Sequence, residues 1–510
     1  MTKPNKFYIT NAIPYVNARP HIGHALEFVE SDVIARYQRQ IGNEVVLLCG
    51  SDENALKNVQ AAEQEKIPVQ ELVDRNSKLF EELAVKLNVQ FDIFQKGSDP
   101  KHHKSSQELW NLCFKNGDIY KKKYTGLYCV GCELFYEKNE LDANGECFEH
   151  PGKKLDEVSE KNYFFKLSKY QKGIEKIIKS DQILIIPQNR KNEVLEFIKQ
   201  GLQDISISRS NERAKNWGVS VPDDPTQKMY VWFDALNIYQ SGTDEQSDGV
   251  RFRSDSGDKR GQDEENEIKH TTFNSKGYKK WWPADLHVIG KGILRFHAIY
   301  WPAFLLSAGL KLPSSIFVHE YVTVNGQKMS KTLGNVIDPL DLIKKYGGEA
   351  LRYYLLRNIS PFSDGDFSED KFVKTYNADL ANGLGNLIAR VAKLCETDNY
   401  THMGSASKVS GHIISIEEYS EAILDFRFND ALSFVWGKIA ALDKFINDEK
   451  PWILIQEKNP RIKSILAHSV DQIQEIAVLL EPFLPETAQK IEEQFKGPKI
   501  ISQNPLFPRI

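Results

Sequence analysis

Two short strings, far apart in the chain, carry the basic side chains that could act on a triphosphate. HIGH at residues 21–24 and KMSKT at residues 328–332 supply His21, Gly23, His24, Lys328, Ser330 and Lys331. Imidazole N–H groups and lysine ammonium groups stabilise the charge that develops on phosphate oxygens when an α-phosphate is attacked. Either string alone is weak evidence, but together and in this order they predict a site that activates a carboxylate as its adenylate.

The residues around HIGH place both histidines at the start of a helix. Residues 6–11, KFYITN, have the β-branched and aromatic character of a strand, and Pro20 stands where a helix would begin. Apolar residues then recur with helical spacing up to residue 40. His21 and His24 should therefore share one face of the first turn, beside backbone amides that favour phosphate, and Gly23 would let a nucleotide approach the backbone. The alternative is that both histidines only decorate a helix start.

KMSKT follows a predicted strand over residues 316–324 and the tight-turn pair Asn325–Gly326. These features predict a mobile cationic loop. Its two ammonium groups, on Lys328 and Lys331, could neutralise a triphosphate and then release pyrophosphate. An ordinary solvated lysine loop is the alternative.

Cysteine supplies an independent pattern. Cys129, Cys132, Cys147 and His150 form C-x2-C followed by C-x2-H, the spacing of a tetrahedral zinc knuckle that leaves no position for a catalytic water. We therefore predict one structural Zn²⁺ per chain. A disulfide is the alternative, which a cytosolic chain disfavours. The remaining cysteines are isolated and are expected to be buried: Cys49, Cys113 and Cys395.

Length and charge are typical of a large soluble enzyme with several domains. The chain has 510 residues and a formal net charge of −4, so an RNA partner would need a local basic patch. No apolar run approaches the length of a membrane span, and the first residues lack the apolar core of a signal peptide. We expect a cytoplasmic protein without a membrane partner.

Longer strings carry a family resemblance. The chain resembles the class I aminoacyl-tRNA synthetases and, among them, the methionyl-tRNA synthetase family. The resemblance covers nearly the whole chain and rests on FYITNAIPYVNARPHIGHA at 7–25, YVWFDAL at 230–236, FHAIYWPAFL at 296–305, YVTVNGQKMSKTLGN at 321–335 and NADLANGLGNLIAR at 377–390. Three positions depart from the family pattern. Thr332 replaces the more frequent serine, Gly292 in IGKGI replaces an aspartate near the amino acid or ribose, and His150 stands where many members have a fourth cysteine.

The resemblance implies a methionine–tRNA ligase. Its substrates are ATP with Mg²⁺, L-methionine and tRNA(Met), including initiator tRNA, for translation initiation and elongation. Methionyl-adenylate and pyrophosphate form first, while His21, His24, Lys328 and Lys331 stabilise charge, and the acyl group then passes to the 3′-terminal adenosine. A zinc knuckle in an insertion between the halves of the nucleotide fold is implied as well.

The resemblance also implies the residues that contact methionine and the anticodon. The methionine pocket comprises Ile13, Tyr15, Asp52, Trp232, Ala235, Leu236, Tyr239, Phe296, His297 and Trp301. Asp52 follows the apolar run VVLLCG, so its carboxylate could bind an α-ammonium group; capping the next helix is the alternative. Tyr15 or His297 could donate a weak hydrogen bond to the sulfur atom. The anticodon-binding positions are Asn386, Arg390 and Trp452, whose side chains suit splayed single-stranded bases.

We expect an α/β fold with a doubly wound, Rossmann-type parallel sheet that is split by the zinc-knuckle insertion and followed by an α-helical bundle. The expected order is a first catalytic half at 1–115, the insertion at 116–225, a second catalytic half at 226–325 with a flexible charged insertion at about 242–270, the KMSKT loop and connection at 326–365, and a helical anticodon-binding domain at 366–510.

Rival interpretations make different demands on the sequence. Synthetases for leucine, isoleucine or valine share both strings but usually carry a larger editing insertion. A different nucleotidyltransferase would leave KMSKT and Trp452 unexplained, and a silent tRNA-binding module would not need His21, His24 and both lysines. Little chain follows the helical region, which favours a monomer.

Overall fold

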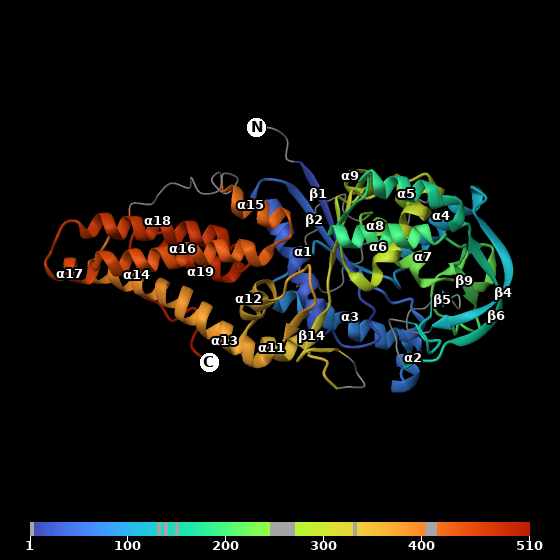
Figure 1. Ribbon diagram of the computed structural model, residues 1–510, viewed down its shortest axis with the longest axis horizontal. Coiled ribbons are helices and arrows are strands. Elements are labelled where there is room, and N and C mark those ends of the chain that lie inside the picture. The colour runs from blue at the N-terminus through green and yellow to red at the C-terminus, as the bar shows by residue number, and fades with distance from the viewer. Residues whose placement is uncertain are drawn as a thin grey trace, which may run out of the picture.

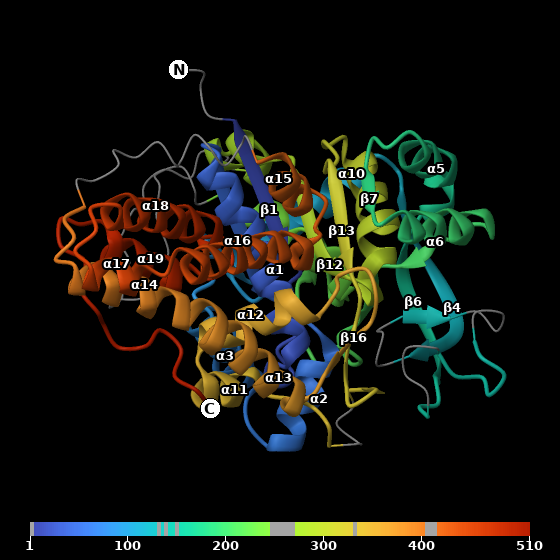
Figure 2. The same cartoon turned by 60° about the vertical axis from the view of Figure 1, so that its left-hand side comes forward.

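The structure is a computed structural model that describes residues 5–129, 134–136, 141–147, 152–244, 271–329, 334–402 and 416–510. Figure 1 shows three parts along the long axis of the molecule, with an α/β part in the middle. C-terminal helices form one end and small antiparallel sheets form the other. Figure 2 keeps these two parts on opposite sides of the α/β part after the view is turned.

The centre of the α/β part is a parallel sheet with the strand order β3-β2-β1-β12-β13-β7. Its strands are β1 (Lys6–Asn11), β2 (Glu44–Ser51), β3 (Ile93–Lys96), β7 (Leu184–Ile186), β12 (Leu286–Gly290) and β13 (Ser315–His319). The order reverses between β1 and β12, and open α/β sheets bind ligands at the carboxyl ends of the strands beside such a reversal. The predicted parallel α/β fold is confirmed, and its candidate site lies at this edge.

Side chains alternate across the sheet and build a separate core on each face. On β1, Ile9 joins the core that continues into the C-terminal helices, while Tyr8 joins the core with the aromatic segments around Trp232 and Trp301. The helices of the α/β part are α1 (Ile22–Gln40), α2 (Leu56–Glu65), α3 (Val69–Lys86), α4 (Pro100–Lys115), α7 (Val231–Ala235), α8 (Ile238–Ser241), α9 (Lys276–Trp281) and α10 (Trp301–Ala308), with short helical turns η4 (Thr272–Asn274), η5 (Lys291–Ile293) and the π-helical η6 (Phe296–Tyr300). Helix α1 is buried on nearly every side.

The segment expected to form the insertion contains two small antiparallel sheets, with the orders β5-β4-β6-β8 and β10-β11-β9. Its elements are β4 (Ile119–Cys129), β5 (Leu134–Tyr136), β6 (Asp156–Phe165), η2 (Leu167–Tyr170), α5 (Gln171–Lys179), α6 (Gln188–Lys199), β8 (Ile205–Ser206), β9 (Ser208–Ser210), β10 (Ser220–Val221) and β11 (Asp224–Met229). The same segment also provides β7, the outermost strand of the central sheet, next to β13.

The run predicted as one strand over residues 316–324 is two strands. The strand is interrupted after β13, at Glu320 and Tyr321. There the Glu320 carboxylate forms an ion pair with the Lys291 ammonium group at 2.8 Å. Strand β14 (Val322–Val324) then joins a separate sheet with β15 (Gln327–Lys328) and β16 (Gly365–Phe367). The predicted tight turn is confirmed, since Asn325 and Gly326 have φ values of 51° and 75°, as a two-residue hairpin turn requires.

The predicted helical C-terminal region is confirmed. Its helices are α11 (Pro339–Tyr346), α12 (Gly348–Asn358), α13 (Glu369–Thr375), the π-helical η7 (Tyr376–Gly385), α14 (Asn386–Thr397), α15 (Glu417–Leu424), α16 (Phe428–Glu449), α17 (Pro451–Gln456), α18 (Ile462–Leu480) and α19 (Pro485–Phe495). Figure 1 shows α14, α16, α18 and α19 packed alongside one another. In the described part of the chain, no helix is long and apolar enough to span a bilayer.

The charged stretch predicted as an insertion at about 242–270 begins within the fold. Gly242 and Thr243 are buried, and Gly242 packs against Leu48 of the central sheet. The remainder, residues 245–270, lies outside the described residues.

Candidate active site

The two histidines of HIGH lie side by side where α1 begins. His21 is the N-cap residue rather than part of the first turn, because its φ of −126° is that of extended backbone. The Gly23 N–H donates to His21 Nδ1 at 3.2 Å, and the His21 N–H donates to His24 Nδ1 at 3.1 Å. The two rings are stacked with their centroids 3.7 Å apart. This reciprocal cap satisfies two amides of the helix start and fixes both rings on one side of it.

The fold brings the segment around KMSKT to HIGH. The Ile22 N–H donates to the carbonyl oxygen of Ile337 at 3.1 Å, which joins the first turn of α1 to the chain after the lysine string. A Cβ atom on Gly23 would lie 3.9 Å from Met329 Cε. Lys328 is exposed, and its ammonium group lies 5.1 Å from the centre of the Tyr321 ring. Ser330, Lys331 and Thr332 lie outside the described residues.

A buried polar cluster lies one turn along α1 from the histidines. Glu27 accepts hydrogen bonds from Asn11 Nδ2 at 2.8 Å and from His319 Nε2 at 2.9 Å, at the carboxyl ends of β1 and β13. Glu30 is fully buried close by, and neither carboxyl oxygen has a hydrogen-bond partner among the residues that the structure describes. The sequence interpretation missed this cluster. Glu27 could have been found, since it follows His24 by three residues and therefore shares its helix face.

Burial and mutual charge set the protonation of this cluster. Burial, and then the neighbouring His21 and His319, hold the pKa of His24 well below its usual value, so His24 is neutral at pH 7. Burial would lower the pKa of His319 too, but the hydrogen bond to Glu27 and the charges of Glu30 and Glu27 outweigh it and raise that pKa to about 9. Burial raises the pKa of Glu30 to about 7. The candidate site therefore combines a neutral imidazole with a buried cation behind it.

Five of the side chains expected around methionine share ring contacts or a hydrogen bond. Trp232 stacks on Phe296 at a centroid distance of 3.7 Å, and the Tyr15 and His297 rings meet Trp232 edge-on at 6.2 and 6.3 Å. Tyr239 lies 5.6 Å from His297. These residues come from three segments that are distant in sequence, and together they form an aromatic wall suited to a thioether.

The expectation that His297 could donate a hydrogen bond to sulfur is not supported by its geometry. His297 Nδ1 lies 3.0 Å from the Ile293 carbonyl oxygen, which can only accept, so Nδ1 carries the proton. Burial lowers the pKa of His297 to about 4, so the ring is neutral and Nε2 accepts from the Tyr239 hydroxyl at 2.8 Å. No N–H of His297 remains for a ligand. His287, which the sequence interpretation also missed, is buried with its ring 4.7 Å from that of Tyr239.

The remaining residues of the expected methionine set surround this wall at different depths. Asp52 is 3% exposed and forms a parallel β-bridge with Tyr15 just beyond the end of β2. The capping alternative for Asp52 is wrong, because α2 begins after Ala55 and has no side-chain cap. Ala235 and Leu236 are buried at the end of α7, Ile13 is partly buried, and Trp301 is fully buried with its ring against Trp282 at 5.8 Å.

The unusual Gly292 has a structural explanation. A Cβ atom at this position would lie 2.4 Å from the Tyr321 hydroxyl oxygen, so the tyrosine occupies the space that a side chain would need. Two ammonium groups lie near the centre of the Tyr321 ring, that of Lys291 at 4.4 Å and that of Lys328 at 5.1 Å.

Two of the four expected zinc ligands are described. Cys129 Sγ and Cys147 Sγ are 3.2 Å apart and buried, well beyond the S–S distance of about 2.0 Å in a disulfide. Cys132 and His150 lie outside the described residues, and no group of three or more potential ligands occurs among those inside them. The predicted burial of the other cysteines is confirmed for Cys49, Cys113 and Cys395.

The three residues expected to read an anticodon lie at the far end of the helical part. The Arg390 guanidinium lies 5.1 Å from the centre of the Trp452 ring, and it is held by Asp443 at 2.9 Å and Asn447 at 2.6 Å. Trp452 is 39% exposed, and Asn386 is exposed one helical turn before Arg390.

A cavity of about 490 Å³ lies next to the aromatic wall, between the sheet of β4 and β6 and the α/β part. Tyr300 lines it and also meets Phe296 edge-on at 5.4 Å. Three arginines line the cavity as well, Arg209, Arg213 and Arg295, and so do the acidic residues Glu160 and Asp204.

The parallel sheet is built from two separate stretches of the chain, and the HIGH segment lies beside the segment that carries KMSKT where the strand order reverses. This arrangement is that of a class I tRNA synthetase. The model of that family, tRNA synthetases class I (M), matches residues 7–392. The chain belongs to the methionine–tRNA ligase family within this class. It is 37% identical to the methionine–tRNA ligase of Rhizobium meliloti, covering 96% of this chain and 92% of the relative, and 39% identical to that of Thermotoga maritima, covering 95% and 74%.

Solved structures agree with this assignment. The Mycobacterium tuberculosis methionyl-tRNA synthetase in complex with methionyl-adenylate is 33% identical, with a TM-score of 0.87 over 99% of this chain and all of the other. The apo form of the same enzyme gives a TM-score of 0.80 at 31% identity, over 99% and 98% of the two chains.

Proposed function

We propose that this chain activates L-methionine with ATP and transfers it to tRNA(Met), initiator tRNA included. The observation that carries the proposal is that the HIGH segment lies beside the KMSKT segment. Ile22 is hydrogen-bonded to Ile337, and Met329 lies close to Gly23. Membership of the methionine–tRNA ligase family supports methionine over leucine, isoleucine or valine. It also argues against an unrelated nucleotidyltransferase and a silent tRNA-binding module.

In the first step, a methionine carboxylate oxygen bonds to the α-phosphorus of ATP and the bond to the bridging oxygen breaks, releasing pyrophosphate. His21 and the neutral His24 donate hydrogen bonds to phosphate oxygens, while Lys328 and Lys331 neutralise the triphosphate together with Mg²⁺ carried by ATP. Gly23 and Ser330 complete the ATP contacts. Because these groups act by position and charge, no covalent intermediate with the protein is required.

The amino acid is held by the aromatic wall. The Asp52 carboxylate binds the α-ammonium group, and its burial of 97% would strengthen that charge-assisted contact. The thioether contacts Tyr15, Trp232, Phe296 and Tyr239, with the other expected pocket residues closing the shape around it. Tyr15 is the remaining candidate for a hydrogen bond to sulfur.

In the second step, a hydroxyl of the terminal adenosine attacks the acyl carbon and AMP leaves. The cavity lined by Arg209, Arg213 and Arg295 adjoins the aromatic wall and is the candidate place for the single-stranded end of an RNA, where a phosphate would replace the Glu160 carboxylate that lies 3.5 Å from Arg213. Asn386, Arg390 and Trp452 contact the anticodon at the other end of the molecule.

Cys129, Cys132, Cys147 and His150 hold one structural Zn²⁺ ion. The paired buried sulfurs of Cys129 and Cys147 fit the donor chemistry, and such an ion would fold the knuckle without taking part in the reaction. Metal analysis of the purified protein tests this, and finding less than one zinc per chain would contradict it. A cytoplasmic monomer remains the prediction for location and assembly.

The assay that tests the function is exchange of labelled pyrophosphate into ATP. We expect exchange that depends on methionine, is absent with leucine, isoleucine or valine, and is followed by charging of tRNA(Met) when the tRNA is added. Exchange with leucine, or with no amino acid, would refute the proposal.

A further inference from the structure

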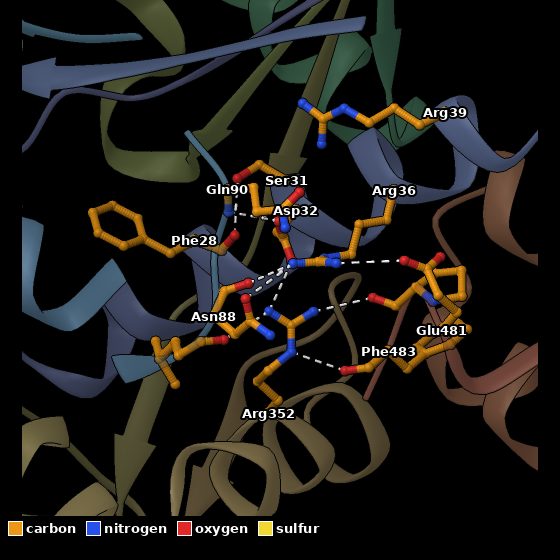
Figure 3. Close-up of polar contacts among 12 residues, drawn as sticks. Phe28, Ser31, Asp32, Arg36, Arg39, Asn88, Gln90, Arg352, Glu481 and Phe483 are labelled. Carbon is orange, nitrogen blue, oxygen red and sulfur yellow. Dashed lines mark hydrogen bonds and ion pairs between the residues drawn. The ribbon is translucent and has the colours of Figure 1, made fainter. Parts of the chain in front are cut away.

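A buried ionic cluster joins α1 to the C-terminal helices. Asp32 of α1 is fully buried, and its carboxylate accepts from Arg36 Nε at 2.7 Å, Arg352 Nη1 at 2.8 Å and the Gln90 N–H at 2.9 Å. Figure 3 shows the two guanidinium groups, which come from α1 and α12, directed toward this carboxylate. We call Asp32, Arg36 and Arg352 the arginine clamp.

Arg352 connects three separate parts of the chain. Besides Asp32, its guanidinium donates to the carbonyl oxygens of Leu87 at 3.0 Å, Pro482 at 3.0 Å and Phe483 at 2.8 Å. Leu87 follows α3, and Pro482 and Phe483 form the turn between α18 and α19. Arg352 itself is fully buried, so these bonds fix the turn at one place relative to α1.

Arg36 adds a second connection between the same parts. Its Nη2 donates to the Asn88 carbonyl oxygen at 2.7 Å, and its Nη1 reaches Glu481 at 3.4 Å, immediately before the same turn. The charge and hydrogen bonds of Arg36, with the charge of Arg352 and the Gln90 N–H, outweigh burial and lower the pKa of Asp32, so the carboxylate is ionised.

Such a cluster is weak evidence for stability as such. Apolar side chains of similar volume often stabilise a core equally well, because they avoid the desolvation of buried charges. A planar guanidinium with several acceptors in fixed directions does, however, impose a directional geometry on the groups that it joins. The arginine clamp is therefore suited to fixing the orientation of α18 relative to α1.

The clamp lies between the two candidate sites of this chain. Helix α1 begins at His21 and reaches Asp32 after about three turns. Helix α18 has 19 residues, so it extends about 28 Å from the clamp to the end where α17 carries Trp452. Both α17, which carries Trp452, and α14, which carries Arg390, pack against α18. The candidate RNA-reading site is therefore attached to the helix that the clamp orients.

We propose that the arginine clamp is a positioning device for tRNA charging, with Arg352 as its central residue. The clamp sets the direction of α18 from α1, so that a tRNA held near Trp452 and Arg390 presents its acceptor end to the adenylate. The proposal rests on the function proposed above. None of the clamp residues belongs to the groups proposed for adenylate formation, which lie at the start of α1, in the KMSKT segment and around the aromatic wall.

The test is a double-mutant cycle between the clamp and the RNA-reading end. Arg352→Lys keeps the charge and loses the fork of donors. We expect pyrophosphate exchange within twofold of the wild type, and kcat/KM for charging of full-length tRNA(Met) lowered about tenfold. In a Trp452→Ala background, Arg352→Lys should lower charging by less than twofold further, because the RNA is no longer held at that end.

The opposite results overturn the proposal. Distant, independent sites normally combine additively, so an equal tenfold loss in both backgrounds would make Arg352 a merely structural residue. Unchanged charging by Arg352→Lys would also overturn the positioning role. If the wild type shows no pyrophosphate exchange, or if Trp452→Ala alone leaves charging unchanged, the proposed function is refuted instead. The two failures are therefore distinguishable.

A second variant covers the case in which Arg352→Lys does not fold. Glu481→Gln changes a carboxylate at the clamp's rim, and we expect a smaller, roughly threefold loss of charging that again vanishes in the Trp452→Ala background. A threefold loss in both backgrounds, or none in either, overturns the proposal. Glu475→Gln is the matched control, since its ion pair with Lys438 at 2.8 Å lies within the helical part. It should leave charging unchanged.

Discussion

The two candidate sites of this chain, at the start of α1 and beside α17, differ in how far their side chains are buried. At the start of α1, Glu27, Glu30 and His319 are buried behind the partly buried His24, and Glu27 accepts a hydrogen bond from His319. At the far end of the helical part, Trp452 is 39% exposed and Arg390 is partly exposed beside it.

The difference follows from what each end has to do. Stabilising charge in a transition state requires groups that are already oriented and shielded from water before the substrate arrives. Reading single-stranded RNA requires a free aromatic face and a guanidinium that the partner itself will cover. A buried polar site reduces the stability of the fold, whereas an exposed RNA-reading site leaves it nearly unchanged.

The largest effect should come from the buried end. His24→Ala removes a hydrogen-bond donor from the α-phosphate, and we expect pyrophosphate exchange to fall about a hundredfold to a thousandfold. His468→Ala, in α18 with its ring against Phe445, is the control and should leave exchange unchanged. If His24→Ala exchanged as well as this control, the buried end would not be the site of adenylate formation.

Substitution at the exposed end should separate the two steps. Trp452→Ala removes a stacking surface worth about 1–3 kcal/mol per base, so kcat/KM for tRNA charging should fall about tenfold to a hundredfold. Exchange should stay within twofold, because it needs no tRNA. An equal loss in both assays would show that the tryptophan supports the fold rather than the RNA contact.

Within the aromatic wall, a smaller effect isolates one hydrogen bond. Tyr239→Phe keeps the ring and removes the hydroxyl that donates to His297 Nε2 at 2.8 Å. The unsatisfied buried nitrogen should loosen the pocket, and we expect KM for methionine to rise about fivefold to tenfold with kcat nearly unchanged. A fall in kcat with KM constant would instead place Tyr239 in the chemical step.

The effect of Glu30 should appear in stability alone. Burial raises its pKa to about 7, so the folded protein keeps a proton that the unfolded chain releases above about pH 4.5. Stability from this group is therefore lost as pH rises toward 7. Glu30→Gln cannot ionise, so its free energy of unfolding relative to the wild type should improve by about 2 kcal/mol between pH 5 and pH 8.

Urea unfolding at both pH values measures this difference. Glu30→Gln also removes one of the charges that raise the pKa of His319. His319 should therefore lose less stability between pH 5 and pH 8 in the variant, which adds to the difference in the same direction. Glu475→Gln, at the more exposed ion pair of α18, should follow the wild type at each pH. Parallel behaviour of Glu30→Gln and the wild type would contradict the protonation assigned to the buried cluster.

Local signals predicted a large part of this molecule. The strand at residues 6–11, the helix through residue 40, the turn at Asn325–Gly326, the parallel α/β class and the helical C-terminal region were all readable, because each depends on propensity and spacing along the chain. The break after His319 was not readable, since SIFVHEYVTV looks like one strand and only the buried Glu320 carboxylate interrupts it.

The sequence by itself determined the reaction class, through HIGH, KMSKT and the aromatic strings, and it determined the cysteine and histidine spacing expected of a metal knuckle. The tertiary structure decided which groups meet: Ile22 with Ile337, Glu27 with His319, Tyr239 with His297, and Arg352 with Asp32 and the turn after α18. These pairs join segments tens to hundreds of residues apart, so no local periodicity records them. They form because the carboxyl ends of parallel strands converge at one edge, and because α12 and the C-terminal helices share a core with α1.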